Sequence, residues 1–394
     1  MSEVSQSPSS PNPLAWGVFL ATSWTWCIGM FLPVLLIHDF GLWGWIVFAI
    51  PNVIGAAAMG WVLRDAQQSR QMVQKHRAAC VTFSIVTILF HLYFAAWVLV
   101  RLTNPLIAAS MLLIAFLIWA IVRTDKQSVG LAIVIYVISL LAFVLVIAKL
   151  GVPSWDLSQA QNAFGQRGVF WLFPVCCLGF LTCPYFDLTF HTARQATNKS
   201  GAKIAFGLGF GLFFLLMILF TLWYAGLIYQ FLFGGYALIV PSLLIIAGHM
   251  IIQSAFTVAA HARAILPVQI VPRRSEIQWV FLSVVLFICF GALVHYFPLN
   301  GVDGYLLFMS FYALIAPAYF CCQVLTRRGP GWLFIIPIIL AAPFYYLGFF
   351  QNQTIYLLPG VAIVLISAVI ARYSGSSAAS ANSASLPARQ ESTL

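Results

Sequence analysis

The sequence is poor in charged residues, and acidic residues are the rarest of them. Asp, Glu, Lys and Arg make up 7% of its 394 residues, and only nine residues are Asp or Glu. Soluble domains carry roughly 25% charged residues, so a chain that is 62% hydrophobic is not a soluble globular protein. Nearly every window of about 20 residues is apolar enough to cross a bilayer. We therefore predict an all-α, multi-pass membrane protein without a separate soluble domain.

Several functional motifs are also missing. The glycines Gly207, Gly209 and Gly211 are not followed by the Lys-Ser or Lys-Thr pair of a phosphate-binding loop, so ATP-driven transport is not expected. Paired carboxylates and clustered metal ligands are absent, and we expect neither an enzyme nor a bound cofactor. The eight cysteines fall in apolar segments without zinc or disulfide spacing. They are interpreted as small packing residues.

The apolar segments predict twelve membrane spans. They cover residues 14–37, 41–63, 79–100, 105–122, 128–149, 168–190, 204–229, 236–260, 278–296, 304–325, 331–350 and 355–371. The tails at 1–13 and 374–394 are rich in Ser, Ala and Pro and are predicted to be disordered.

The positive charges predict the orientation. The loops after even-numbered spans and the C-terminal tail hold 16 of the 19 Lys and Arg residues, and only Arg101, Lys149 and Arg167 lie on the other side. Cytoplasmic loops carry such an excess, so both termini are predicted to be cytoplasmic, in the plasma (inner) membrane. The net charge of +10 then marks the inner face of the protein. It does not indicate a nucleic-acid partner.

The longest outer loop, 150–167, divides the first ten spans into two sets of five. Residues 14–149 form the predicted first repeat, 168–326 the second, and two further helices follow within 327–373. Because five is odd, the second repeat enters the membrane from the opposite side. This inverted arrangement is common in secondary transporters, whose first helices in each repeat are often interrupted.

The first span of each predicted repeat contains glycine and proline near its middle. Gly29 and Pro33 lie in span 1, and Gly179 and Pro184 lie in span 6. Proline removes a backbone donor and clashes with the preceding turn. We interpret the two segments as a pair of broken helices, although glycine and proline are generally more frequent in membrane helices than in soluble ones.

With these features, residues 14–326 resemble the LeuT-like inverted-repeat transporters, and most of all the sodium:solute symporters. Ser23 followed by Ile28-Gly29-Met30 is similar to the family's first helix, with Thr25 where the family usually has an acid. Residues 179–195 are similar to its sixth helix. The resemblance implies a solute site between helices 1 and 6, completed by helices 3 and 8, and a sodium site on helices 1 and 8.

Asp187 is the only acidic residue within an apolar segment. A carboxylate inside a bilayer costs about 2.5–3.5 kcal/mol even on insertion scales, so it must be paired, protonated or in contact with water. One interpretation is that Asp187 binds the solute, a coupling cation or a proton. The other places it at the inner mouth, paired with Arg194 or His191.

The candidates for solute binding combine the polar and aromatic residues of the expected pocket. They are Trp24, Thr25, Trp26, Gly29, His91, Cys183, Tyr185, Asp187 and His249. The tryptophans can instead belong to an aromatic belt, and each histidine can be a packing residue. The candidate ion ligands are Thr22, Ser254 and Thr257, because the expected part of span 8, Ile245–His249, contains no serine.

These observations favour a secondary transporter of a small organic solute, coupled to Na⁺ or to H⁺. Histidine titrates near physiological pH and suits proton coupling, while the resemblance implies Na⁺. The alternative is a transporter-like membrane sensor or accessory subunit that binds a ligand without moving it. The missing acid in span 1 and the missing serine in span 8 motivate that alternative. The expected partners are the solute and the lipid bilayer.

Overall fold

The computed structural model describes residues 12–153, 156–162, 164–235, 240–268, 301–326 and 333–384. Within these ranges the chain is almost entirely helical. The first part of the chain contains α1 (Pro13–Trp24), α2 (Cys27–Phe40), α3 (Leu42–Val62), α4 (Ala66–Lys75), α5 (Arg77–Phe94), η1 (Ala95–Leu99), α6 (Val100–Leu102), α7 (Pro105–Ile121) and α8 (Asp125–Leu150). A long connection with one short 3₁₀ turn, η2 (Gly165–Gly168), follows.

The second part begins with α9 (Val169–Thr182). It continues with η3 (Cys183–Phe186), α10 (Leu188–Ala196), α11 (Lys199–Leu208), η4 (Gly209–Phe214), α12 (Leu215–Phe233), α13 (Pro241–Ile265), η5 (Leu266–Val268), α15 (Gly301–Ser310), η7 (Phe311–Ile315), α16 (Ala316–Tyr319), η8 (Phe320–Leu325), α17 (Ile335–Tyr345), η9 (Tyr346–Phe350), η10 (Thr354–Tyr356) and α18 (Leu357–Ala384).

The helices account for eleven of the twelve predicted spans among the described residues. Eight are continuous and long enough to cross a membrane, one is a pair bent by 58° between α1 and α2, and two are shorter apolar helices, at Pro105–Ile121 and Ile335–Phe350. The predicted span 278–296 lies outside the described residues. The chain is an integral, multi-pass membrane protein.

Two elements differ from the sequence-based expectation. α4 lies where only a loop was expected, and its start is fixed by Asp65, whose carboxylate accepts the N–H of Gln68 at 2.7 Å. α18 continues to Ala384, beyond the predicted tail boundary at residue 374. The candidate span ends at Tyr373, and four alanines, the residue with the highest helix propensity, lie in the helical extension 374–384.

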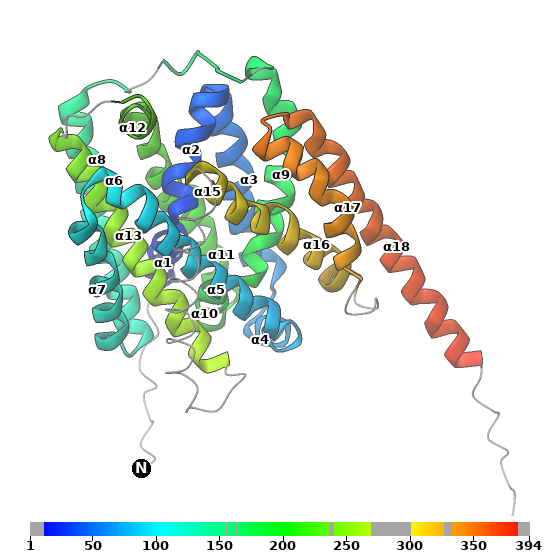
Figure 1. Ribbon diagram of the computed structural model, residues 1–394. Helices are drawn as coiled ribbons and strands as arrows, with labels where there is room; N and C mark the ends of the chain where they lie inside the picture. Colours follow the sequence, from blue (N-terminus) through cyan, green and yellow to red (C-terminus); the bar gives the residue numbers. More distant parts are fainter. Residues whose placement is uncertain are drawn as a thin grey trace, which may run out of the picture.

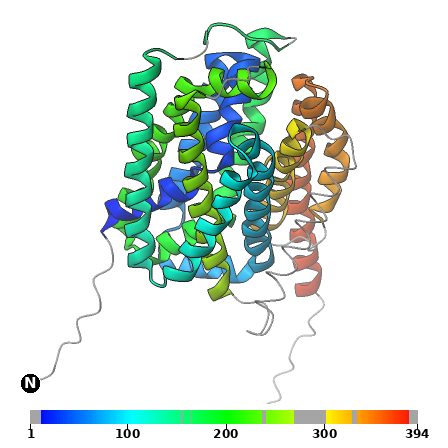
Figure 2. The same cartoon turned by 60° about the vertical axis from the view of Figure 1, so that its left-hand side comes forward.

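The helices stand side by side with their ends on two opposite faces (Figure 1). We call the face that carries the α8–α9 connection the loop side, and the face where α1 begins and α18 ends the termini side. α17 and α18 pack on one flank against α9 and α16, and α7 and α8 stand on the opposite flank (Figures 1 and 2). The α1–α2 and α9–α10 pairs run through the interior between these flanks.

The contact between α3 and α9 depends on the absence of a side chain at Gly55. A Cβ atom at this position would overlap the carbonyl group of Phe180 in α9. In membranes, helices associate closely through such small residues because lipid provides no hydrophobic driving force between them. Gly55 therefore holds α3 against the first half of the broken span 6.

We expect Gly55→Ala to lower stability by about 1–3 kcal/mol, the usual result of overpacking. Gly248→Ala is the matched control, because a Cβ at Gly248 meets no atom within 4 Å and alanine favours the helix. Thermal unfolding of the detergent-purified variants measures both. Equal stability of the two variants would contradict the tight α3–α9 contact.

Candidate functional site

The first helix break lies at Thr25 and Trp26, between α1 and α2. The hydroxyl of Thr25 donates to the carbonyl of Ala21 at 2.8 Å, and that of Ser23 donates to Leu20 at 3.1 Å. Trp26 is extended, with ψ of 173°, and its indole N–H turns back to donate to the carbonyl of Ser23. The carbonyl of Ala21 also accepts the backbone N–H of Thr25 at 2.9 Å, whereas the carbonyl of Ser23, near the end of α1, is bonded by the Trp26 indole.

The start of α2 is capped by a histidine from α5. The N–H of Cys27 donates to Nε2 of His91 at 3.2 Å, and Nδ1 of His91 lies 2.7 Å from the carbonyl of Thr87. These contacts require a proton on Nδ1 and a lone pair on Nε2. His91 is therefore held neutral, as the cap of a half-helix inside the membrane.

The break of span 1 falls within the predicted segment 23–33, but Pro33 does not cause it, because this proline lies inside α2. The bend falls eight residues earlier, at Thr25. Proline has no N–H to donate to the carbonyl four residues before it, which here belongs to Gly29. Pro33 thus releases a carbonyl from the helix ladder at a residue that lines the cavity described below.

The second break lies between α9 and α10 and includes Pro184, as predicted. The 3₁₀ turn η3 ends at Phe186, and Asp187 is the N-cap of α10. Its Oδ1 accepts hydrogen bonds from the N–H and the hydroxyl of Thr189, both at 2.7 Å, and from the N–H of Phe190 at 3.4 Å. A carboxylate at this position satisfies the free N–H groups of the helix start.

The two breaks contact each other in the middle of the protein. The ring of Trp24 lies 4.8 Å from that of Phe190 and 4.2 Å from that of Trp26. The hydroxyl of Thr189 is 3.3 Å from that of Ser23. Each half-helix end therefore meets its counterpart from the other half of the chain.

A cavity of about 460 Å³ extends from the breaks to the loop-side ends of the helices. Trp24, Trp26, Asn52, Cys183 and Tyr312 lie at its deep end. The lining residues with polar side chains nearer the loop side are His38, Asp39, Tyr229, Asp303, Asn352 and Thr354. The remaining lining residues are mostly aliphatic or aromatic, and no Lys or Arg of the described chain is among them.

Asn52 fixes the deep end of this cavity. Its Oδ1 accepts the indole N–H of Trp24 at 2.7 Å, and the residue is 2% exposed. Tyr312 in the π-helical turn η7 reaches the same end, with its hydroxyl 2.9 Å from that of Thr87. The deep end is thus an aromatic pocket with one amide.

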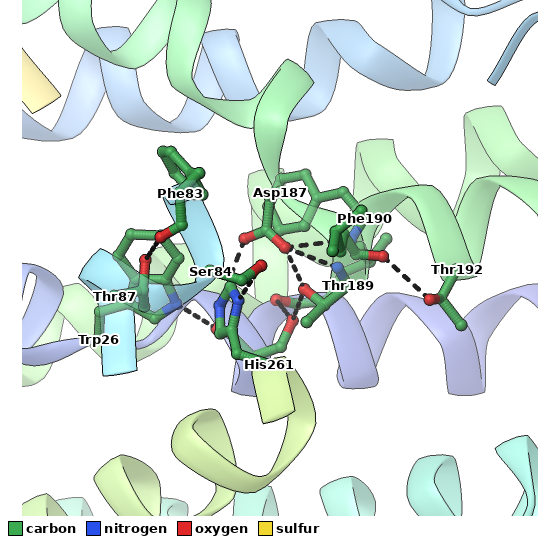
Figure 3. A network of polar contacts seen from close by, with 12 residues as sticks. Trp26, Phe83, Ser84, Thr87, Asp187, Thr189, Phe190, Thr192 and His261 are labelled. Atoms are coloured by element: carbon green, nitrogen blue, oxygen red, sulfur yellow. Dashed lines mark hydrogen bonds and ion pairs between the residues drawn. The ribbon is translucent and has the colours of Figure 1, made fainter. Parts of the chain in front are cut away.

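Trp26 also lies beside a buried polar cluster formed by Asp187, His261 and Ser84 (Figure 3). It lines the cavity, and its ring lies 5.4 Å from that of His261 in α13. Nε2 of His261 is 3.7 Å from Oδ2 of Asp187, and its Nδ1 is 3.1 Å from the hydroxyl of Ser84. Asp187, His261 and Ser84 are fully buried.

The structure places four of the nine predicted solute-binding residues in the cavity wall. These are Trp24, Trp26, Gly29 and Cys183. Asp187 lies behind Trp26, and its carboxylate faces His261. Asp187 lines neither the cavity nor an exposed inner mouth, because it is fully buried. The two partners expected for its side chain bond elsewhere. His191 bonds Ser69 and the carbonyl of Tyr185, and Arg194 bonds the carbonyls of Leu63 and Thr197.

The other predicted residues point elsewhere. The Thr25 hydroxyl and the His91 ring serve the helix break, and Tyr185 packs 5.1 Å from the ring of Phe320. His249 faces α8, with Nδ1 3.0 Å from the hydroxyl of Ser139.

Two of the three candidate ion ligands have buried hydroxyls without a protein partner. Ser254 and Thr257 are 0% exposed, and neither side-chain oxygen makes a hydrogen bond. They lie three residues apart on α13, which packs against α1. The Thr22 hydroxyl instead donates to the carbonyl of Val18 at 2.9 Å.

The sequence reasoning missed His261, Ser84, Thr189 and Asn52. His261 is the partner of Asp187, yet the two residues are far apart in sequence, and no local pattern links them. Asn52 lies near the small residues Gly55, Ala56, Ala57 and Ala58, a pattern that favours close helix packing. A polar side chain between Pro51 and a run of small residues was the available signal.

Asp187→Ala removes the side-chain oxygen that accepts the first N–H groups of α10, whereas Asp187→Asn keeps an amide oxygen that can accept them. Both variants lose the charge, so their comparison isolates the cap. We expect the alanine variant to be less stable than the asparagine variant by about 1 kcal/mol, the usual value of an N-cap. Thermal unfolding of the purified proteins measures this, and equal stability would rule out the capping role.

No protein-family profile and no curated protein matches the sequence. Solved structures match over most of the chain. A Na⁺-coupled sialic acid symporter in its substrate-bound outward-open state has a TM-score of 0.54 at 14% identity, covering 92% of this chain and 90% of that one. Mhp1 in its inward-facing conformation has a TM-score of 0.52 at 11% identity, covering 96% and 95%. The prediction is confirmed for the fold: the chain has the LeuT-type fold of these transporters.

Proposed function

We propose that the protein is a secondary active transporter that moves a small organic solute across the membrane by alternating access, coupled to Na⁺ or H⁺. The observation that carries this proposal is the cavity of about 460 Å³, whose deep end is built by the two helix breaks. Half-helix ends at mid-membrane present backbone groups to solute and ion. A pocket of this volume is in the usual range for small-molecule sites.

Similar folds support the mechanism. The sialic acid symporter was seen with substrate in an outward-open state, and Mhp1 was seen both inward-facing and closed with bromovinylhydantoin bound. This fold therefore adopts states open to either side in those proteins. In the present structure the cavity reaches the loop side, while Trp26, Phe186 and Phe190 are buried toward the termini side.

The lining of the cavity restricts the solute. Carboxylates at Asp39 and Asp303 lie toward the loop side, and the described lining contains no Lys or Arg to neutralise an anion. The deep end offers the faces of Trp24 and Trp26, which attract apolar rings and cations, and the Asn52 amide. We infer an uncharged or cationic solute with an apolar or aromatic body, held by Trp24, Trp26, Gly29 and Cys183.

A sodium site is proposed at Ser254 and Thr257. Hard cations prefer oxygen ligands, and a buried hydroxyl without a partner is costly unless a ligand satisfies it. Both hydroxyls meet this description. Carbonyls at the end of α1 are the expected remaining ligands, because α1 packs against α13 and ends in the break.

An uptake screen in proteoliposomes tests the function. Matched amines, amides and carboxylates of the same aromatic or aliphatic body are offered with a Na⁺ gradient, a pH gradient or neither. We expect gradient-driven accumulation of an uncharged or cationic member and no accumulation of its carboxylate. If Na⁺ drives uptake, Ser254→Ala with Thr257→Val should abolish the Na⁺ dependence, whereas Ser110→Ala, on the outer helix α7, should not.

The same preparation distinguishes the sensor alternative. A solute that raises the thermal stability of the protein while its flux stays at background would favour a sensor or accessory subunit. Folded protein that neither binds nor transports any member of the screen would contradict the proposed solute class.

A further inference from the structure

Asp187 and His261 face each other with one unsatisfied atom each (Figure 3). Oδ1 of Asp187 accepts three hydrogen bonds, but Oδ2 accepts none. Nε2 of His261 also lacks a hydrogen-bond partner, and the two atoms are 3.7 Å apart. Both side chains are 0% exposed. A buried polar atom without a partner is costly, and here two such atoms point at one another.

A proton is the ligand that this gap accommodates. If the imidazole proton is on Nδ1, which lies 3.1 Å from the Ser84 hydroxyl, the lone pairs of Nε2 and Oδ2 face each other and repel. One proton on either atom turns this repulsion into an attraction. If the imidazole proton is on Nε2, it already points at the carboxylate, and a second proton makes the imidazole cationic or the carboxyl neutral. In each case the pair has a place for one added proton.

Other titratable groups near the pair do not bind this proton in its place. The elements packed around Asp187 and His261 carry Cys80 and His91 of α5, Cys183 and Tyr185 of η3, His191 and Arg194 of α10, and Tyr312 of η7. His91, His191, Arg194 and Tyr312 are bonded to other partners. Among the described residues, His261 is the only basic side chain within ion-pair distance of Asp187.

We propose that the Asp187–His261 pair is a proton-binding site that carries the coupling proton of transport. Its role in coupling rests on the proposed transport function, whereas the binding of a proton does not. The proton comes from water on one side and leaves to the other, without any further reactant. Both residues of the pair belong to the second repeat, because Asp187 starts the second half of span 6 and His261 lies on α13, while Ser84 of α5 in the first repeat bonds His261.

Trp26 is the element that connects this site to the cavity. One side of Trp26 lines the cavity, and its ring contacts His261 at 5.4 Å. An imidazolium at this position would lie against the Trp26 ring and attract it, as cations attract aromatic rings. Protonation of the pair therefore changes how firmly Trp26 closes the deep end of the cavity. Solute and proton would act on the same side chain from its two sides.

Infrared difference spectroscopy of the full-length protein in nanodiscs tests the proton site. The sample is titrated between about pH 3 and pH 9, a range that includes the ordinary pKa values of carboxyl and imidazole groups. We expect a protonated-carboxyl C=O band that is lost in Asp187→Asn and kept in Asp39→Asn. Asparagine retains the cap of α10, so the variant tests the proton and not the fold. Absence of an Asp187-dependent band throughout this range would overturn the proposal.

His261→Gln tests the pairing. We expect it to move the midpoint of the Asp187 band by about one pH unit or more, whereas His191→Gln, whose ring bonds Ser69, should leave the midpoint in place. An unchanged midpoint in both variants would show that Asp187 titrates alone and would overturn the paired site.

Transport measurements separate this proposal from the proposed function. If a solute is found, the pH-driven accumulation of that solute by Asp187→Asn should be at least tenfold lower than by the wild-type protein. Exchange of the solute at equal pH on both sides should continue in this variant. Accumulation that is unchanged in Asp187→Asn would overturn the coupling role while leaving the transporter assignment intact. Absence of any uptake by the wild-type protein, together with a titrating Asp187 band, would contradict the transporter and retain the proton site.

Discussion

The structure depends on how the chain satisfies backbone groups that two broken helices leave unpaired in the membrane. Each unpaired group in hydrocarbon costs several kcal/mol, so a break needs side chains in fixed places. The Trp26 indole serves the end of α1, His91 serves the start of α2, and Asp187 serves the start of α10. These polar residues are therefore required by the fold before any solute or ion is considered.

This requirement also places the functional groups. Asp187 uses Oδ1 for the helix cap, which leaves Oδ2 directed at His261. Trp26 is fixed by its own indole bond, so its ring stands between the cavity and His261. The cap residues thus become the boundary between a solute cavity and a buried titratable pair. In the proposed mechanism, solute and proton act on this boundary from its two sides.

Composition and the apolar segments were sufficient to predict the membrane class and eleven spans among the described residues, and Pro184 marked the second break. The first break lies within the predicted segment 23–33, but Gly29 and Pro33 are not its cause. Its causes are hydrogen bonds of Thr25 and Trp26, whereas Pro33 is accommodated inside α2. In spans that are apolar all around, periodicity does not tell which face is inward. The contact of His249 with α8 and the pairing of Asp187 with His261 come from tertiary packing, which one sequence does not encode locally.

Native cysteines allow the central claim, alternation around the Trp26 barrier, to be tested directly. Cys176 lines the cavity, and Cys80 is buried in the first turn of α5 on the termini side. Variants that keep only one of them are reacted with a small thiol reagent in nanodiscs at a series of pH values, with and without solute. The account predicts reciprocal reactivity, so that conditions which expose Cys80 protect Cys176. Reactivities that rise together, or a Cys80 that never reacts while uptake proceeds, would contradict it.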